Sequence, residues 1–114
     1  MNPTQRGRRA EEVAASFLTY KGCEILDRNW RTRWCEIDIV ARRSQVVYFC
    51  EVKYRVTGNQ GNGAEYITSR KLQQMHFAAE LWIATHTWPG AYEICAIEVS
   101  GKDYRITGVF KTVS

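Results

Sequence analysis

Three charged residues in the middle of the chain have the types and spacing to bind a metal ion and act on a phosphate. Asp38 stands in the segment EIDIV, and Glu51 and Lys53 stand in the segment YFCEVKYR. Because side chains alternate along a strand, Glu51 and Lys53 share a face. Carboxylates withdrawn from water repel one another unless a cation lies between them. This pattern favours a hard divalent ion such as Mg²⁺, with a lysine beside it, facing a phosphate substrate.

A plainer interpretation exists for the same residues. Asp38 or Glu51 could pair with Lys53 or Arg55 in a ladder of ion pairs on an exposed face of a sheet. The tripeptide E-x-K alone is a very weak motif. The residues by themselves therefore leave both a metal site and a structural ion-pair ladder open.

The elements that would position these residues can be read from the pattern of apolar residues. Ala10, Val13, Ala14, Phe17 and Leu18 recur at helical spacing, and Gly22 is suited to end that helix. We predict helices over about 8–20 and from about 65 or 69 to 84, and strands over about 24–31, 34–42, 45–55, 92–99 and 104–110. The order predicts a mixed α/β fold of the α+β kind, with two helices flanking a mostly antiparallel sheet. The second helix could serve as the crossover of one parallel pair.

The second and third strands are predicted to form a tight hairpin with Arg43-Ser44 as its link. In a hairpin with an even number of turn residues, the numbers of two paired residues add up to an odd number. Asp38 and Glu51 meet that condition, so any even turn places them on one face. An odd loop or a bulge would separate them.

Length and composition describe an ordinary globular chain. The 114 residues, 45% apolar and 25% charged, suit a single domain spanning 1–114. We expect residues 1–6 and 112–114 to be flexible and the Gly- and Asn-rich segment 57–63 to be a mobile loop. No apolar run is long enough for a membrane span, and the polar N-terminus is not a signal peptide, so the cytoplasm is the expected compartment. The four cysteines show no metal-binding spacing.

Positive charge is concentrated in the first half of the chain. Residues 1–55 contain eleven Lys and Arg against seven Asp and Glu, whereas the remainder contains five of each. Such an asymmetry suits a polyanionic partner, since Lys and Arg neutralise phosphates. A solvated basic surface without a partner explains the charge equally well.

The complete pattern resembles a known group of proteins. Asp38 followed by Glu51-Val52-Lys53 is similar to the motif of the PD-(D/E)xK restriction-endonuclease-like superfamily, whose core is αβββαβ. More of the chain resembles one branch, the YraN family of small bacterial endonuclease-like proteins, which is similar to archaeal Holliday-junction resolvases. The segments that support this resemblance are GRRAE (7–11), ILDRNWR (25–31), EID (36–38) and FCEVKYR (49–55).

The resemblance implies a role for each matching residue. Asp38 and Glu51 would hold Mg²⁺ or Mn²⁺, with the Val52 backbone carbonyl and Glu11 as further ligands, and Lys53 would be the catalytic lysine. Glu11 and Glu12 are also both suited to a helix N-terminus, but Glu11 matches the family's acidic position. The expected nucleic-acid contacts are Arg8, Arg31, Arg55 and Lys71.

We therefore expect a Mg²⁺-dependent endodeoxyribonuclease. Structured or branched DNA as substrate follows from the resolvase resemblance alone, and cutting a junction needs two active sites, which would call for a homodimer. Two other classes remain open: a nucleic-acid-binding module without activity, and a protein-interaction domain that retains the fold. Trp30 and Trp34 alternate with Arg31 and Arg33, an arrangement that could stack on unpaired bases, although a tryptophan in a strand is more often part of a core.

Overall fold

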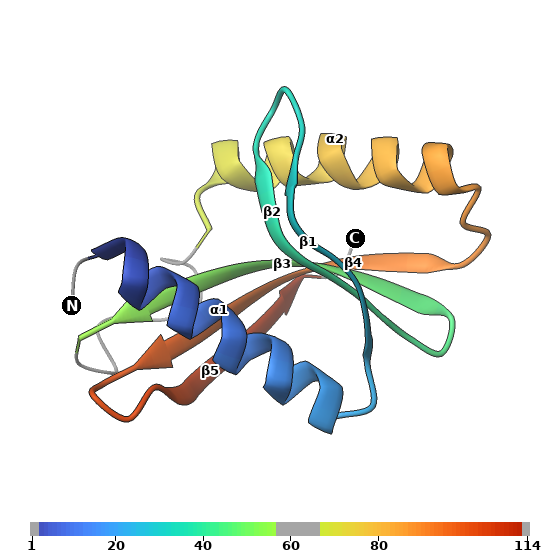
Figure 1. Cartoon of the computed structure of the whole chain (residues 1–114). Coiled ribbons are helices and arrows are strands. Elements are labelled where there is room, and N and C mark those ends of the chain that lie inside the picture. The colour runs from blue at the N-terminus through green and yellow to red at the C-terminus, as the bar shows by residue number, and fades with distance from the viewer. Residues whose placement is uncertain (1–2, 57–66, 113–114) are drawn as a thin grey trace.

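The fold consists of two helices and one sheet (Figure 1), in a computed structural model that describes residues 3–56 and 67–112. In chain order the elements are α1 (Pro3–Tyr20), β1 (Glu24–Arg31), β2 (Glu36–Arg43), β3 (Val46–Arg55), α2 (Ser69–His86), β4 (Ala91–Ser100) and β5 (Arg105–Thr112). This order and the mixed five-stranded sheet confirm the predicted fold class.

The five strands follow one another across the sheet in the order β1-β2-β3-β4-β5. All neighbours are antiparallel except β3 and β4, which run parallel from Val46 opposite Ala91 to Arg55 opposite Ser100. Parallel neighbours need a long crossover, and α2 supplies it, as its position in the sequence predicted.

Helix α1 covers one face of the sheet. Its small buried residues Ala10 and Ala14 lie against Ile39, Cys50 and other side chains of what we call the α1-side core. Alanine at these positions allows the helix axis to approach the sheet closely. The helix ends as predicted at Gly22, which has a positive φ of 92° and is followed by a bond from Cys23 N–H to the Leu18 carbonyl.

Helix α2 covers the opposite face. Met75, Ala79 and Trp82 pack against Phe49 and Ile94 in the α2-side core. The helix begins after Thr68, whose hydroxyl accepts the Lys71 N–H at 3.1 Å. This cap selects the later of the two predicted starts, because the side chain satisfies a first-turn donor.

The element ends differ from the predictions by a few residues. Helix α1 begins at Pro3, so residues 3–6, which we expected to be flexible, are helical. The β2–β3 turn consists of Ser44 and Gln45, one residue later than predicted, but it still contains two residues. The predicted mobile loop at 57–63 lies outside the described residues.

In the part of the chain that the structure describes, neither helix combines the length and apolar character that crossing a membrane requires.

Candidate metal and nucleic-acid site

The candidate site forms where β2 and β3 separate. The two strands pair without a register shift as far as Ile39 and Cys50. The next hydrogen-bonded pair would join Ile37 to Val52, but Ile37 turns away and packs in the α2-side core. The Asp38 carboxylate replaces the backbone acceptor of that pair, and its Oδ2 accepts a hydrogen bond from the Val52 N–H at 2.8 Å. Asp38 is therefore fixed at the fork between the two strands.

Glu51 lies beside Asp38 and is held by two lysines. The paired register ends at Ile39 and Cys50, so Asp38 and Glu51 are the next residues along the two strands, and the charge of Glu51 helps to raise the pKa of Asp38. Lys53 Nζ is 3.4 Å from Glu51 Oε1, and Lys71 Nζ, from the first turn of α2, is 3.3 Å from Oε2. Although Glu51 is buried, its Oε2 accepts no hydrogen bond of good geometry within the described residues. The charge of Lys71 therefore balances the negative charge of this oxygen, which can still accept a hydrogen bond.

Burial makes Asp38 a weak acid. The side chain is only 9% exposed, and burial raises its pKa to about 7. The hydrogen bond from Val52 N–H opposes this rise, whereas the negative charges of Glu51, Glu11 and Glu36 add to it. Buried carboxylates that repel one another are the environment in which a divalent cation binds favourably.

Glu11 reaches the same region from α1. It is half-buried, whereas Glu12 is exposed, so the structure distinguishes the two acids in the way that the resemblance implied. Burial raises the pKa of Glu11, and the Arg28 charge opposes the rise. Glu11 also forms a side-chain hydrogen bond with Asn29 and lies within electrostatic range of Glu51.

The four predicted nucleic-acid contacts surround this cluster in two groups. Arg8 and Arg31 line an open depression of about 450 Å³ together with Glu11 and Glu36. Arg31 also pairs with Glu36, with Nε 3.0 Å from Oε2. Lys71 pairs with Glu51, as described above, and Arg55 Nε lies 3.3 Å from Glu98. Arg8, Arg31 and Lys71 therefore each lie near a glutamate of this region, and Arg55 follows Lys53 by two residues on β3.

Sequence reasoning missed two residues of this neighbourhood. Asn29 has a φ of 52°, a left-handed conformation uncommon outside glycine, and it contacts Glu11. An asparagine within a strand was the available signal. Glu98 is 1% exposed, lies opposite Lys53 on β4 and accepts a hydrogen bond from Thr107 Oγ1 at 2.5 Å. An acid within the apolar run of β4 could have indicated it.

The two tryptophans near the basic residues have different environments. Trp30 packs against the α2-side core. Trp34 lies at the tip of the β1–β2 hairpin, 5.7 Å from the exposed Phe77 ring of α2, with the Arg33 guanidinium 5.1 Å above its own ring. Only Trp34 therefore remains a candidate for base stacking.

The donor set fits a hard divalent ion held by few protein ligands. Within residues 3–56 and 67–112, no group of three or more His, Cys, Asp or Glu side chains is placed to hold a metal. Magnesium often uses only one or two carboxylates, with waters and substrate phosphates completing its shell. Asp38 and Glu51 supply two. The Val52 carbonyl points to the same side of β3 as its N–H, which is the Asp38 side.

The fold and site define a mixed α/β protein with two buried carboxylates and two lysines at a strand fork. Residues 10–106 match the model of the uncharacterised protein family UPF0102. The chain belongs to this family, which is the YraN family named by the resemblance above.

Relatives in several bacteria share most of the chain. A UPF0102 protein of Parafrankia sp. (strain EAN1pec) is 46% identical over 92 residues, covering 80% of this chain and 78% of the relative. One from Leifsonia xyli is 42% identical over 94 residues, covering 82% and 80%. One from Vibrio parahaemolyticus is 31% identical over 103 residues, covering 87% and 85%.

Proposed function

We propose that the protein is a metal-dependent endonuclease of the PD-(D/E)xK class that hydrolyses phosphodiesters in structured or branched DNA. The observation that supports it most is the strand fork, where Asp38 and Glu51 are both buried, the charge of Glu51 acts on Asp38, and Lys53 Nζ is 3.4 Å from Glu51. The αβββαβ order of the first six elements agrees with that class.

Asp38 and Glu51 would hold Mg²⁺ or Mn²⁺, with the Val52 carbonyl as a further ligand. Within the described residues, Glu11 is not placed with them as a third carboxylate ligand, and it would act on the site through its charge. When bound, the ion would polarise a phosphoryl oxygen and lower the pKa of a water molecule. The Val52 N–H orients the Asp38 carboxylate by its 2.8 Å bond, so one ligand is preorganised. The fork also places both carboxylates on rigid strands, as precise ligation requires.

Lys53 would act on the substrate itself. Its side chain is 45% exposed, so its ammonium can leave Glu51 and donate hydrogen bonds to a phosphate oxygen or to the attacking water. A positive charge there favours the negative charge that builds on the phosphate during in-line displacement. Lys71 would bind a neighbouring phosphate in the same way, while Arg8 and Arg31 position the strand.

A DNA-binding module without activity is the second candidate. One observation favours it: both Glu51 oxygens already have a lysine within 3.4 Å, so part of the negative charge that would attract a metal is compensated. Under this alternative, the basic residues would bind the phosphate backbone, and the acids would serve to hold the lysines in place.

One experiment separates the two candidates. Purified protein is incubated with a four-way junction, a flap and a linear duplex in Mg²⁺, Mn²⁺ or EDTA, beside Lys53→Ala and the control Lys102→Ala, which removes an exposed lysine of the β4–β5 turn. The endonuclease proposal expects cleavage that requires metal and Lys53 but not Lys102. Tight binding without cleavage in either metal would replace it with the binding module. Equal cleavage by both variants would remove Lys53 from the mechanism.

The proposed partner of each chain is a second copy, because cutting both strands of a junction requires two sites. Sedimentation of the protein with and without a four-way junction measures this directly. A single copy per junction at saturation would contradict the homodimer.

A further inference from the structure

A second cavity lies under the C-terminal end of α1, on the α1 side of the sheet. Its volume is about 160 Å³, and its lining comes from α1, the segment after it, and strands β2 to β5. Phe17, Leu18 and Val109 contribute apolar walls. Neither Glu11 nor any residue of the strand fork is among its described lining residues, so this cavity does not belong to the site described above.

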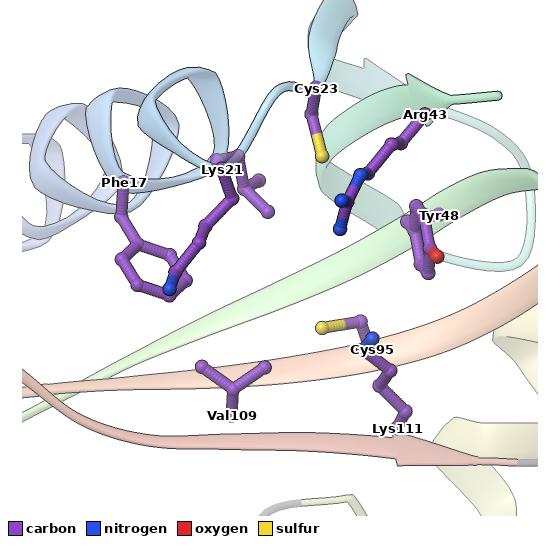
Figure 2. A pocket seen from close by; sticks show the side chains of 9 residues that line it. Phe17, Lys21, Cys23, Arg43, Tyr48, Cys95, Val109 and Lys111 are labelled. Carbon is purple, nitrogen blue, oxygen red and sulfur yellow. The ribbon is translucent and has the colours of Figure 1, made fainter.

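Three cations line the cavity: Lys21, Arg43 and Lys111. Figure 2 shows the Arg43 guanidinium pointing into the space between the thiols of Cys23 and Cys95, and the Lys111 side chain extending toward Cys95. No carboxylate is among the described residues of the lining. Three positive charges on so small a cavity create a strong local preference for an anion.

The partners of these cations leave their charge largely uncompensated. Lys21 Nζ lies 5.7 Å from the ring centre of Phe17, and Lys111 Nζ lies 5.3 Å from that of Tyr48. An aromatic ring attracts a cation but carries no net charge. Glu93 acts on Cys95 from outside the lining and offsets part of this positive charge.

The two thiols show that the charges reach the interior of the cavity. Burial raises the pKa of Cys23, and the charges of Arg43 and Lys111 oppose the rise. A hydrogen bond from Cys50 lowers the pKa of Cys95, and Lys111 lowers it further. Arg43 and Lys111 are therefore the two lining cations whose charges act on these thiols.

The size of the cavity limits the ligand. A cavity of about 150 Å³ lined by apolar side chains is large enough for benzene, and this one is about 160 Å³. Apolar walls favour a ligand with an apolar body. The parallel N–H donors of a guanidinium suit a carboxylate.

We propose that this cavity binds a small organic carboxylate with an apolar body about the size of a benzene ring. The carboxylate pairs with Arg43 and Lys111, and the apolar body packs between Phe17, Leu18 and Val109. This site is independent of the metal site and would exist whether or not the protein cuts DNA.

Benzoate serves as the probe, and benzamide is its uncharged counterpart of the same shape. Amide spectra of ¹⁵N-labelled protein are recorded while each compound is added up to about 10 mM, which saturates a site of millimolar affinity, at constant ionic strength. Benzoate should shift the signals of Gly22, Cys23, Cys95 and Val109 and should bind roughly tenfold more tightly than benzamide.

Variants test the assignment of the cations. Lys111→Gln and Arg43→Gln should each weaken benzoate binding roughly tenfold and leave benzamide unchanged. Arg42→Gln removes the same charge from the neighbouring residue, whose guanidinium lies over Trp88, and should have no effect. Val109→Trp, which fills the cavity from a partly exposed position, should abolish binding of both compounds. Equal affinity for the two compounds, or equal loss in all three charge variants, would overturn the proposal.

Discussion

Replacing Asp38 with asparagine should stabilise the metal-free protein. The pKa of Asp38 is raised from 3.8 in a free side chain to about 7 in the folded protein, chiefly by burial. The folded state therefore holds the proton more tightly than the unfolded chain. The stabilisation of the folded protein by the proton on Asp38 is complete below pH 4, and it is lost as the pH rises to about 7. Above pH 7 the folded protein must keep a buried carboxylate charged, a cost that asparagine removes.

The magnitude follows from the size of the shift. A difference of about three pKa units at about 1.36 kcal/mol each gives an upper value of about 4 kcal/mol at pH 8. Asparagine can still accept the Val52 N–H, but a neutral acceptor forms a weaker bond than a carboxylate. We therefore expect Asp38→Asn to raise the free energy of unfolding by about 3 kcal/mol, which for a chain of this length raises Tm by about 12 °C.

The assay is thermal and urea unfolding in EDTA at several pH values between 4 and 8. Asp103→Asn is the matched control, since Asp103 is an exposed acid that pairs only loosely with Arg105, 3.8 Å away. The difference between Asp38→Asn and wild type should be largest at pH 8 and small at pH 4. A stability difference that does not change with pH, or a less stable variant at pH 8, would refute the reasoning.

Three further predictions concern the strand fork, the buried Glu98 and the tip of the β1–β2 hairpin. In melting experiments at pH 8, Mn²⁺ should raise the Tm of wild type but not that of Asp38→Asn, and an equal rise in both would argue against the metal site. Glu98→Gln should lower the free energy of unfolding by about 2–3 kcal/mol, measured in urea, because it removes the buried negative charge that lies 3.3 Å from Arg55 Nε; an unchanged value would show that this ion pair contributes no net stability. Trp34→Ala should weaken binding to DNA with unpaired bases by about tenfold and hardly affect a linear duplex, in fluorescence anisotropy, if the ring beside Phe77 stacks on bases; equal losses on both would contradict stacking.

The sequence was most informative about the sheet and the acidic pair. A turn with an even number of residues was enough to predict the register that pairs Ile39 with Cys50, and the structure confirms that register; beyond it the strands separate, and Ile37 and Ile39 lie in different cores. The register depends on local spacing, which can be counted. The length of a turn could be shifted by one residue without changing the result, because only its parity matters.

The remaining features of the site depend on contacts that spacing does not reveal. The bond from Val52 N–H to Asp38 forms where β2 leaves β3, at the point where Ile37 packs in the α2-side core. The approach of Lys71 to Glu51 depends on where α2 starts. Burial of Glu98 depends on its neighbours in β3 and β5, which its own position in the sequence could not show.

The parallel pairing of β3 with β4 also affects how the chain folds. Each pair in that ladder joins residues far apart in the sequence, such as Val46 with Ala91, so a long loop must close before any of these pairs forms. Strands β1, β2 and β3 are joined by short turns and can associate sooner. The carboxylates at the fork therefore meet in the fast, local part of the search, whereas the slow step is the docking of β4. Mutual repulsion of these acids would then act before the barrier and slow the folding itself.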